Sequence, residues 1–339
     1  SRLIQCTEQM LHLDLNPPAY FLWQKLLSLL LTLLAAAALI FAVLHLLPGN
    51  AAQVLLGPDA DPQAVAALAT QLGLDTPAWP RFTGWLRGLL HGDLGHSYAY
   101  GEPVADLLLQ RLQLTVPLAL LALGVSCLLA LPMGLYAAAY QGRWPDKLLM
   151  GSTQLGLAIP SFWLAMLLIV VFAVRLQWVS AGGFPGWTQD SGGGLLPALQ
   201  ALILPTLALA GVQTAILARL TRSAVLEHVG ADFVRTARAK GLGRHQILWG
   251  HVLRNAMGPI LTLLGLQFAN LLAGAIVVEN VFYLPGLGRL LFQAIANRDL
   301  LVVQNGVLLL VAMVIVVNFW VDVLHAWLDP RIRLPGAGR

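Results

Sequence analysis

The sequence has few charged residues for its length. Only 11% of the 339 residues are Asp, Glu, Lys or Arg, whereas 58% are hydrophobic and the mean hydropathy is +0.74. A soluble domain has roughly 25% charged residues, so this composition excludes an ordinary soluble enzyme and predicts an integral membrane protein. The apolar residues occur in long continuous runs, which are typical of transmembrane helices rather than of alternating barrel strands.

Motifs of catalytic and nucleotide sites are also missing. The chain has no Gly-Lys pair and therefore no phosphate-binding sequence of the form G-x-x-x-x-G-K-[ST]. It has no H-E-x-x-H sequence, and within the apolar runs the only histidines are His45 and His325, both near the ends, which argues against an intramembrane enzyme. The two cysteines, Cys6 and Cys127, are far apart, and no disulfide is expected.

Six apolar segments are each long enough for the roughly 20 residues that cross a bilayer. Their flanking charged residues are Lys25 and Asp59, Arg111 and Arg143, Lys147 and Arg175, Asp190 and Arg219, Arg254 and Glu279, and Asp299 and Asp322. Prolines within them, at 117, 132, 160 and 205, are expected to bend their helices. We therefore expect an all-α membrane protein, a bundle of six transmembrane helices over residues 26–328.

The distribution of basic residues predicts that both termini are cytoplasmic. With the N-terminus inside, 14 of the 20 basic residues lie on the cytoplasmic side. Residues 1–25 are then a cytoplasmic extension, 48–113 a long first periplasmic loop, 219–257 a cytoplasmic loop and 329–339 a cytoplasmic tail. The first apolar run has no short basic segment before it and no small-residue cleavage site after it, which favours a retained signal anchor.

The long periplasmic loop is expected to be a small helical cap. The segment DPQAVAALATQLGL predicts an amphipathic helix that begins at Asp61-Pro62. We favour a solvated lid packed on the bundle over a separate binding domain. His91 and His96 are interpreted as polar surface residues of this loop, and no metal site is predicted.

A basic segment, DFVRTARAKGLGRHQILWGHVLRNA (232–256), separates two apolar runs. Asp232 suits the N-terminus of a helix, and Gly241 and Gly243 are expected to end it. Phe233, Ala237 and Gly241 recur every four residues and predict a face of apolar and small side chains that fits a groove on another protein. An interfacial helix held on anionic lipid by its basic residues is the alternative.

Uncharged polar residues inside the apolar segments are candidates for a translocation pathway. The candidates are Gln154, Gln213, Gln267 and Asn270. Gln267 and Asn270 are three residues apart and are expected to share one helix face. The alternative is that these amides form hydrogen bonds between helices and serve only packing.

Several motifs resemble the permease subunits of bacterial ATP-binding-cassette importers, in the branch that carries oligopeptides, dipeptides and nickel. The sequence RTARAKGL is similar to the cytoplasmic coupling loop of that branch, and ENVFYLPGLGRLLFQAIANRDLLVVQ (279–304) is similar to its last outside loop. Other matching motifs are LHLLPGN (44–50), LGLDTPAWPRFTGWLRGLLHGDLGHSY (72–98), IPSFWLAMLLIVVFAVRLQWVSAGG (159–183) and DPRIR (329–333). The resemblance covers residues 26 to 333, with departures at Asn50 and Leu301.

The resemblance implies a multi-pass protein of the bacterial inner membrane that has no nucleotide site of its own. The expected partners are a second homologous permease, two ATPase subunits that hold ATP and Mg²⁺, a periplasmic or lipid-anchored solute-binding protein, and membrane lipid, but no nucleic acid. The residues expected to couple to the ATPase are Asp232, Phe233, Arg235, Thr236, Ala237, Lys240 and Gly241.

The resemblance also implies a cargo class. Short peptides are expected, and nickel or a metal chelate is the alternative within the same importer class. An ion-coupled secondary transporter is a weaker alternative, because such proteins need ionisable residues near the middle of the membrane and the six apolar segments contain none.

Overall fold

The computed structural model describes residues 17–328, apart from 47–50, 58, 72, 74 and 191. Five of its helices are long and apolar enough to cross a membrane. These helices are α2 (Pro17–Leu46), α6 (Val104–Ala139), α9 (Leu195–Val229), α12 (Leu253–Val281) and α14 (Leu300–Leu328). The remainder of the described chain is helical or irregular, with a single isolated bridge between His96 and Pro103. The all-α prediction is confirmed.

The predicted third span is not one straight helix. It consists of α7 (Trp144–Ala158), followed by α8 (Ser161–Leu168) and a π-helical turn, η1 (Ile169–Arg175), with a bend of 98° between the two halves. The break lies at Pro160, which has no N–H and forces Ile159 into an extended conformation (φ −91°, ψ 118°). The bundle therefore has five continuous spans and one broken one.

The other expected bends do not break their helices. Pro117 and Pro132 lie inside the continuous helix α6, and Pro205 lies inside α9. Helix α6 packs closely against α9 at Gly134, where a Cβ would lie 2.7 Å from the backbone oxygen of Ala218. Only glycine allows the two backbones to approach this closely.

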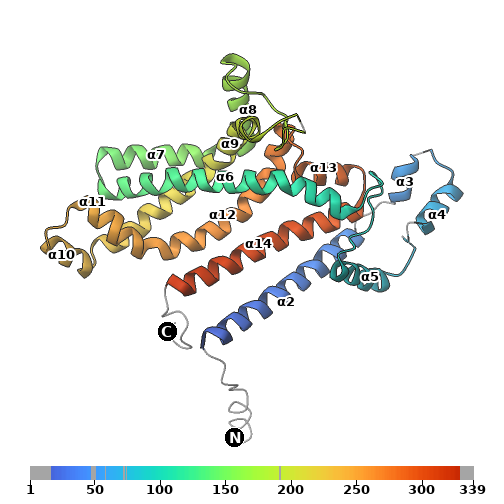
Figure 1. Cartoon of the computed structure of the whole chain (residues 1–339), viewed down its shortest axis with the longest axis horizontal. Coiled ribbons are helices and arrows are strands. Elements are labelled where there is room, and N and C mark those ends of the chain that lie inside the picture. Colours follow the sequence, from blue (N-terminus) through green and yellow to red (C-terminus); the bar gives the residue numbers. More distant parts are fainter. Residues whose placement is uncertain are drawn as a thin grey trace, which may run out of the picture.

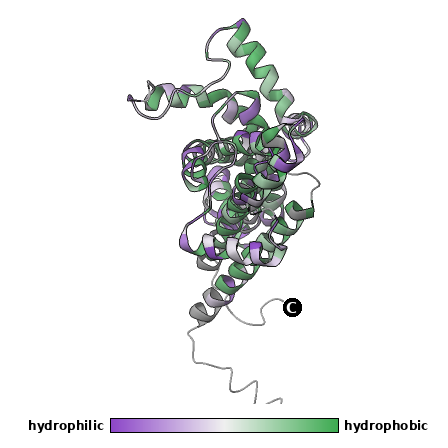
Figure 2. Cartoon of the chain, turned by 90° about the vertical axis from the view of Figure 1, so that its right-hand side faces the viewer, coloured by the Kyte–Doolittle hydropathy of each residue, from purple (hydrophilic) through white to green (hydrophobic). Residues whose placement is uncertain are grey.

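The helices α6, α9 and α12 form the centre of the bundle, and α2 and α14 lie side by side along one flank (Figure 1). Lys25 of α2 forms an ion pair with Asp322 of α14 at 2.7 Å. Large apolar side chains are exposed on several helices, such as Leu31 on α2 and Leu128 on α6, and Figure 2 shows that hydrophobic residues run along much of the helices. This surface is suited to contact with lipid and with other membrane subunits.

The loop between α2 and α6 is the expected helical cap. It contains α3 (Ala51–Leu56), α4 (Pro62–Gln71) and α5 (Ala78–His91), at the end of the bundle opposite α10 (Figure 1). The side chain of Asp61 accepts a hydrogen bond from the N–H of Gln63 at 3.1 Å, which explains why α4 begins where the sequence predicted. The predicted loop extended to residue 113, but α6 already begins at Val104.

Two buried polar side chains hold the cap on the bundle. Asn305 of α14 accepts a hydrogen bond from the indole N–H of Trp85 at 2.9 Å and donates one to the carbonyl of Leu94 at 3.1 Å. Asp299, just before α14, accepts hydrogen bonds from the hydroxyl of Ser97 and the N–H of Ala99. Helix α5 and the segment after it are therefore fixed to the last span.

A second buried carboxylate fixes the short helix α13 (Leu287–Ala296). Glu279, near the end of α12, is fully buried and accepts hydrogen bonds from the hydroxyl of Thr115 at 2.6 Å and from the N–H of Gly288 at 2.7 Å. The N–H of Leu287 donates to the hydroxyl of Thr115 at 2.8 Å. The first N–H groups of α13 are thus paired with side chains of α6 and α12.

Candidate functional site: helix α10 and the exposed face of α12

The basic segment forms a separate short helix, α10 (Asp232–Ala239), between α9 and the helix that re-enters the bundle. That re-entry is made by α11 (Arg244–Gln246) and the π-helical turn η2 (Ile247–Val252), which continue into α12. The predicted cytoplasmic loop began at residue 219, but α9 extends as far as Val229. Residues 219–229 of the expected cytoplasmic loop thus form the end of α9.

Helix α10 ends in a Schellman motif. The N–H of Leu242 donates to the carbonyl of Ala237 at 3.2 Å, and the N–H of Gly241 donates to the carbonyl of Arg238 at 2.9 Å. Gly241 has φ +79°, and a Cβ there would meet nothing within 4 Å. The position therefore requires glycine for its left-handed backbone and not for space. The prediction that Gly241 ends the helix is confirmed.

The apolar face of α10 is turned toward the chain's own core, which corrects the predicted free docking face. Val234 and Ala237 are 1% and 6% exposed, and Phe233 packs against the same cluster, which includes Leu217 of α9 and Ile247 of η2. The sequence pattern identified an apolar face, but this chain covers that face itself. Phe233 and Ala237 consequently anchor α10 to the bundle and do not form a face that is free to contact another protein.

The exposed face of α10 is polar and basic. Asp232, Arg235, Thr236, Lys240 and Gly241 are exposed. The carboxylate of Asp232 lies 3.6 Å from the guanidinium of Arg235, and the hydroxyl of Thr236 donates to the carbonyl of Asp232 at 3.0 Å. Such an exposed pair contributes little to stability, so both charges stay available to a partner.

A buried ion pair supports the helix that leads into α10. Arg222 of α9 donates to both carboxylate oxygens of Asp146 on α7, at 2.7 and 2.8 Å, and the N–H of Gly142 donates to the same carboxylate at 2.8 Å. The side chains are 24% and 5% exposed, respectively. A bidentate pair of this kind holds two helices in one orientation. It fixes α7 to α9 two turns before α9 ends.

The four candidate pathway residues divide into two groups. Gln213 and Gln267 are buried, and the side-chain N–H of Gln267 donates to the backbone carbonyl of Gln213 at 3.0 Å. This bond connects α12 to α9. Gln267 therefore has the role in helix packing that was the alternative to a pathway role. Gln154 and Asn270 are exposed on α7 and α12, and Gln154 accepts a hydrogen bond from Arg219 at 3.5 Å.

Gln267 and Asn270 differ in burial although they are only three residues apart on α12. The boundary between the buried and exposed faces of the helix runs between them, so Gln267 is buried against α9 and Asn270 is exposed. Asn270 belongs to an exposed row on α12. The row consists of Thr262, Leu266, Asn270, Ala273 and Val277. Its spacing of three or four residues makes it one continuous helix face.

No grouping of three or more His, Cys, Asp or Glu side chains suitable for a metal ion occurs within the described residues. His91, at the end of α5, is engaged with the carbonyl oxygen of Arg87 through its Nδ1 atom at 2.7 Å. His91 is exposed, and this local contact agrees with its interpretation as a polar surface residue.

The fold is similar to that of a chain in a solved transporter. A chain in an inward-facing structure of the MetNI methionine ABC transporter aligns with a TM-score of 0.54 and 19% sequence identity, covering 66% of this chain and 96% of that chain. At this identity the likeness concerns the arrangement of helices alone.

Curated relatives match almost the whole chain. A putative peptide transport system permease protein of Brucella abortus (strain 2308) is 40% identical over 301 residues, 89% of this chain and 95% of that protein. The glutathione transport system permease protein GsiC of Escherichia coli O6:H1 is 40% identical over 310 residues, 91% of this chain and 97% of that protein.

Family models agree with these relatives. Residues 19–119 match the N-terminal membrane component of binding-protein-dependent transport systems, and residues 130–334 match the inner membrane component itself. The second match alone includes more than half of the chain. This multi-pass protein therefore belongs to the family of inner membrane components of binding-protein-dependent transport systems.

Proposed function

We propose that this permease carries short peptides, and that the exposed face of α10 couples it to ATPase subunits. The observation that carries the cargo class is the 40% identity, over about nine-tenths of the chain, to relatives described as peptide and glutathione permeases. The described helices provide spans and, on α10, an exposed basic face. ATP and Mg²⁺ are proposed to bind to partner ATPase subunits.

The packing of α10 supports a mechanical role. Its inner face is part of one buried cluster with α6, α9 and η2, so α10 cannot shift independently of these helices. A partner that binds Arg235, Thr236 and Lys240 on the exposed face would move the helices of that cluster together as a rigid unit. ATP-driven closure of two ATPase subunits then selects between two packed states of the bundle.

The exposed row on α12 supports a pathway at an interface. Asn270 is the amide in a row that otherwise has one hydroxyl and apolar side chains, and the row is exposed in the described part of the chain. A second homologous permease, presenting a similar face, would enclose a weakly polar path. An amide offers both a donor and an acceptor to a peptide bond without holding a charge. Gln154 on α7 is proposed to line the same path.

Two alternatives to an ATP-driven peptide permease are a different cargo and a different energy source. Nickel or a metal chelate would be carried by the same machinery, with a solute-binding protein deciding the cargo. An ion-coupled transporter would use a titrating carboxylate inside the bundle. The buried carboxylates described above are Asp146, Glu279 and Asp299, and each accepts several hydrogen bonds. Their pairing supports a structural role for all three.

Reversing charge on the outer face of α10 tests the coupling role. The double substitution Arg235→Glu and Lys240→Glu is expected to reduce ATP-dependent uptake of a labelled dipeptide by more than tenfold. Like charges at a desolvated interface cost several kcal/mol of binding free energy, and about 1.4 kcal/mol already corresponds to a factor of ten. Both residues are exposed, so the amount of protein in the membrane should stay unchanged. Uptake is measured in proteoliposomes that contain the co-purified complex.

The matched control is Arg143→Glu, an exposed arginine at the start of α7 that lies outside α10. Uptake by this variant should remain within twofold of the wild type. Wild-type uptake by the double variant would remove α10 from the coupling role. Uptake driven by an ion gradient without ATP would overturn the proposed class, and competition by nickel but not by dipeptides would overturn the proposed cargo.

A further inference from the structure

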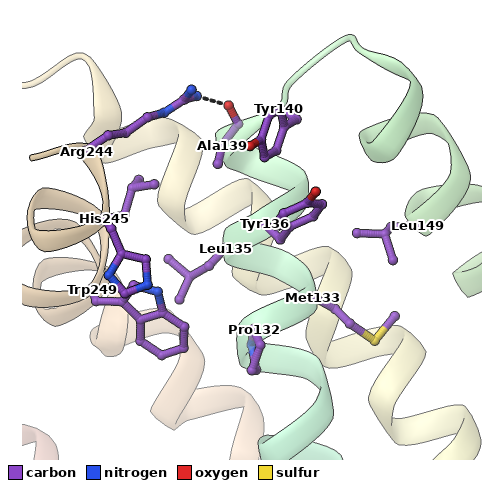
Figure 3. A pocket seen from close by; sticks show the side chains of 11 residues that line it. Pro132, Met133, Leu135, Tyr136, Ala139, Tyr140, Leu149, Arg244, His245 and Trp249 are labelled. Carbon is purple, nitrogen blue, oxygen red and sulfur yellow. Dashed lines mark hydrogen bonds between the residues drawn. The ribbon is translucent and has the colours of Figure 1, made fainter.

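A groove of about 580 Å³ lies beside α11, at the end of the bundle that carries α10 (Figure 3). The last turns of α6 form its floor. Arg244, His245 and Trp249 lie on one side of α6, and Leu149 of α7 lies on the other. The coupling role proposed above uses neither Arg244 nor Trp249.

The groove carries positive charge and no negative charge. None of its lining residues is Asp or Glu. Arg244 donates a hydrogen bond to the carbonyl of Ala139, and its guanidinium lies 5.5 Å from the ring centre of Tyr140. Within the described part of the chain, no carboxylate lies within ion-pair distance of Arg244. A guanidinium has five N–H donors, so it retains capacity to bind an anion.

The length of α6 allows the groove to lie at the membrane interface. This helix has 36 residues, about 54 Å at 1.5 Å per residue, whereas the hydrocarbon core is about 30 Å thick. Its last turn can therefore lie at the level of the lipid headgroups. Tyr136 is 50% and Trp249 is 41% exposed there, and aromatic residues of this kind are enriched at that depth.

The lining changes from polar to apolar along the groove. Arg244 and Tyr140 lie at the end of α6, whereas Pro132 and Met133 lie about two turns further into the bundle, with Leu149 opposite. A molecule that fits this gradient has an anionic head and a hydrocarbon tail. A soluble anion such as inorganic phosphate would use only the first part of the groove.

We propose that this groove binds an anionic phospholipid of the leaflet on the α10 side. The guanidinium of Arg244 contacts the phosphodiester, Tyr136 and Tyr140 offer hydroxyl donors, and an acyl chain lies along Met133 and Leu149. A zwitterionic lipid fits less well, because its ammonium group would meet Arg244 and no carboxylate. Basic pockets between helices at this side of a membrane are suited to such headgroups.

The test uses photoactivatable lipids and the chain purified with its partner subunits. The complex is placed in vesicles that contain a photoactivatable phosphatidylglycerol or, separately, the matching phosphatidylcholine probe, and the labelled peptides are mapped by mass spectrometry. We expect phosphatidylglycerol to label peptides from the ends of α6 and η2. Arg244→Gln should reduce that labelling about tenfold, the expected effect of losing a charge-assisted contact.

Two variants keep the result interpretable. Arg244→Lys retains the charge and should retain most labelling, whereas Arg143→Gln removes a nearby exposed charge outside the groove and should change nothing. Three outcomes would each overturn the proposal. The two probes could label the groove equally, the Arg244→Gln variant could be labelled as strongly as the wild type, or the groove could be covered by the second permease and remain unlabelled. Because the readout is lipid contact and not transport, it is independent of the proposed cargo and coupling.

Discussion

Replacing Asp146 by asparagine is expected to reduce ATP-dependent uptake at least tenfold and to lower the free energy of unfolding by about 3 kcal/mol. The neutral amide would leave the guanidinium of Arg222 largely buried without its counter-charge. The connection between α7 and α9 would loosen two turns before α10. A force applied at α10 would then move α9 without moving the bent span. Uptake in proteoliposomes and unfolding of the purified protein in detergent measure the two effects.

The neighbouring residue provides the control for this prediction. Lys147→Gln changes one exposed charge on the same helix, next to Asp146, and should leave uptake and stability close to the wild type. Arg222→Met should reproduce the effect of the Asp146 variant, because either change leaves one unpaired charge. If Asp146→Asn takes up peptide normally and unfolds like the wild type, the ion pair does not link the two helices in function.

Substituting Gly288 by alanine is expected to prevent the protein from accumulating in the membrane. A Cβ at this position would lie 2.3 Å from the Cα of Ile276 and 3.0 Å from the carboxylate of Glu279. Backbone atoms of α12 cannot yield, so α13 would be pushed away from the side chain that pairs its first N–H groups. Overpacking costs about 1–3 kcal/mol, and the lost hydrogen bonds to a buried carboxylate add about 1–3 kcal/mol.

A glycine on the same long helix as Ile276 provides the comparison. A Cβ at Gly258 of α12 would meet nothing within 4 Å, and this residue has no unusual backbone conformation. Gly258→Ala should therefore accumulate normally. No gain in stability is expected from the alanine, because Gly258 precedes Pro259 and a Cβ before proline is disfavoured in a helix. Membrane levels are measured by immunoblotting and stability by thermal unfolding in detergent. Normal accumulation of Gly288→Ala would show that α13 is not fixed by this contact.

The helical framework could be predicted because composition decides it. Uninterrupted apolar runs must form helices in a bilayer, and Asp61-Pro62 is a local signal for the start of α4. The prolines show the limit of such signals. Pro160 breaks its span, whereas Pro117 and Pro205 lie within continuous helices. The difference depends on neighbouring helices, which no local pattern records.

Contacts between distant residues could not be predicted from sequence alone. Asp146 and Arg222 are separated by 76 positions and belong to no local motif, yet they form the best-aligned ion pair of the described bundle. In α10 the periodicity identified Ala237 as part of an apolar face but did not show which protein covers that face. The neighbouring Val234, which is even more buried, was missed as an anchor.

The central claim is that the outer face of α10 touches an ATPase subunit during transport. The most direct measurement is cysteine cross-linking in the active complex, with Cys6 and Cys127 first replaced by serine. Arg235→Cys should cross-link to an ATPase subunit with a yield that changes on addition of ATP, whereas Leu90→Cys in the cap, 85% exposed at the opposite end, should not. Absence of any cross-link from position 235, in a complex that still imports peptide with ATP, would contradict the account.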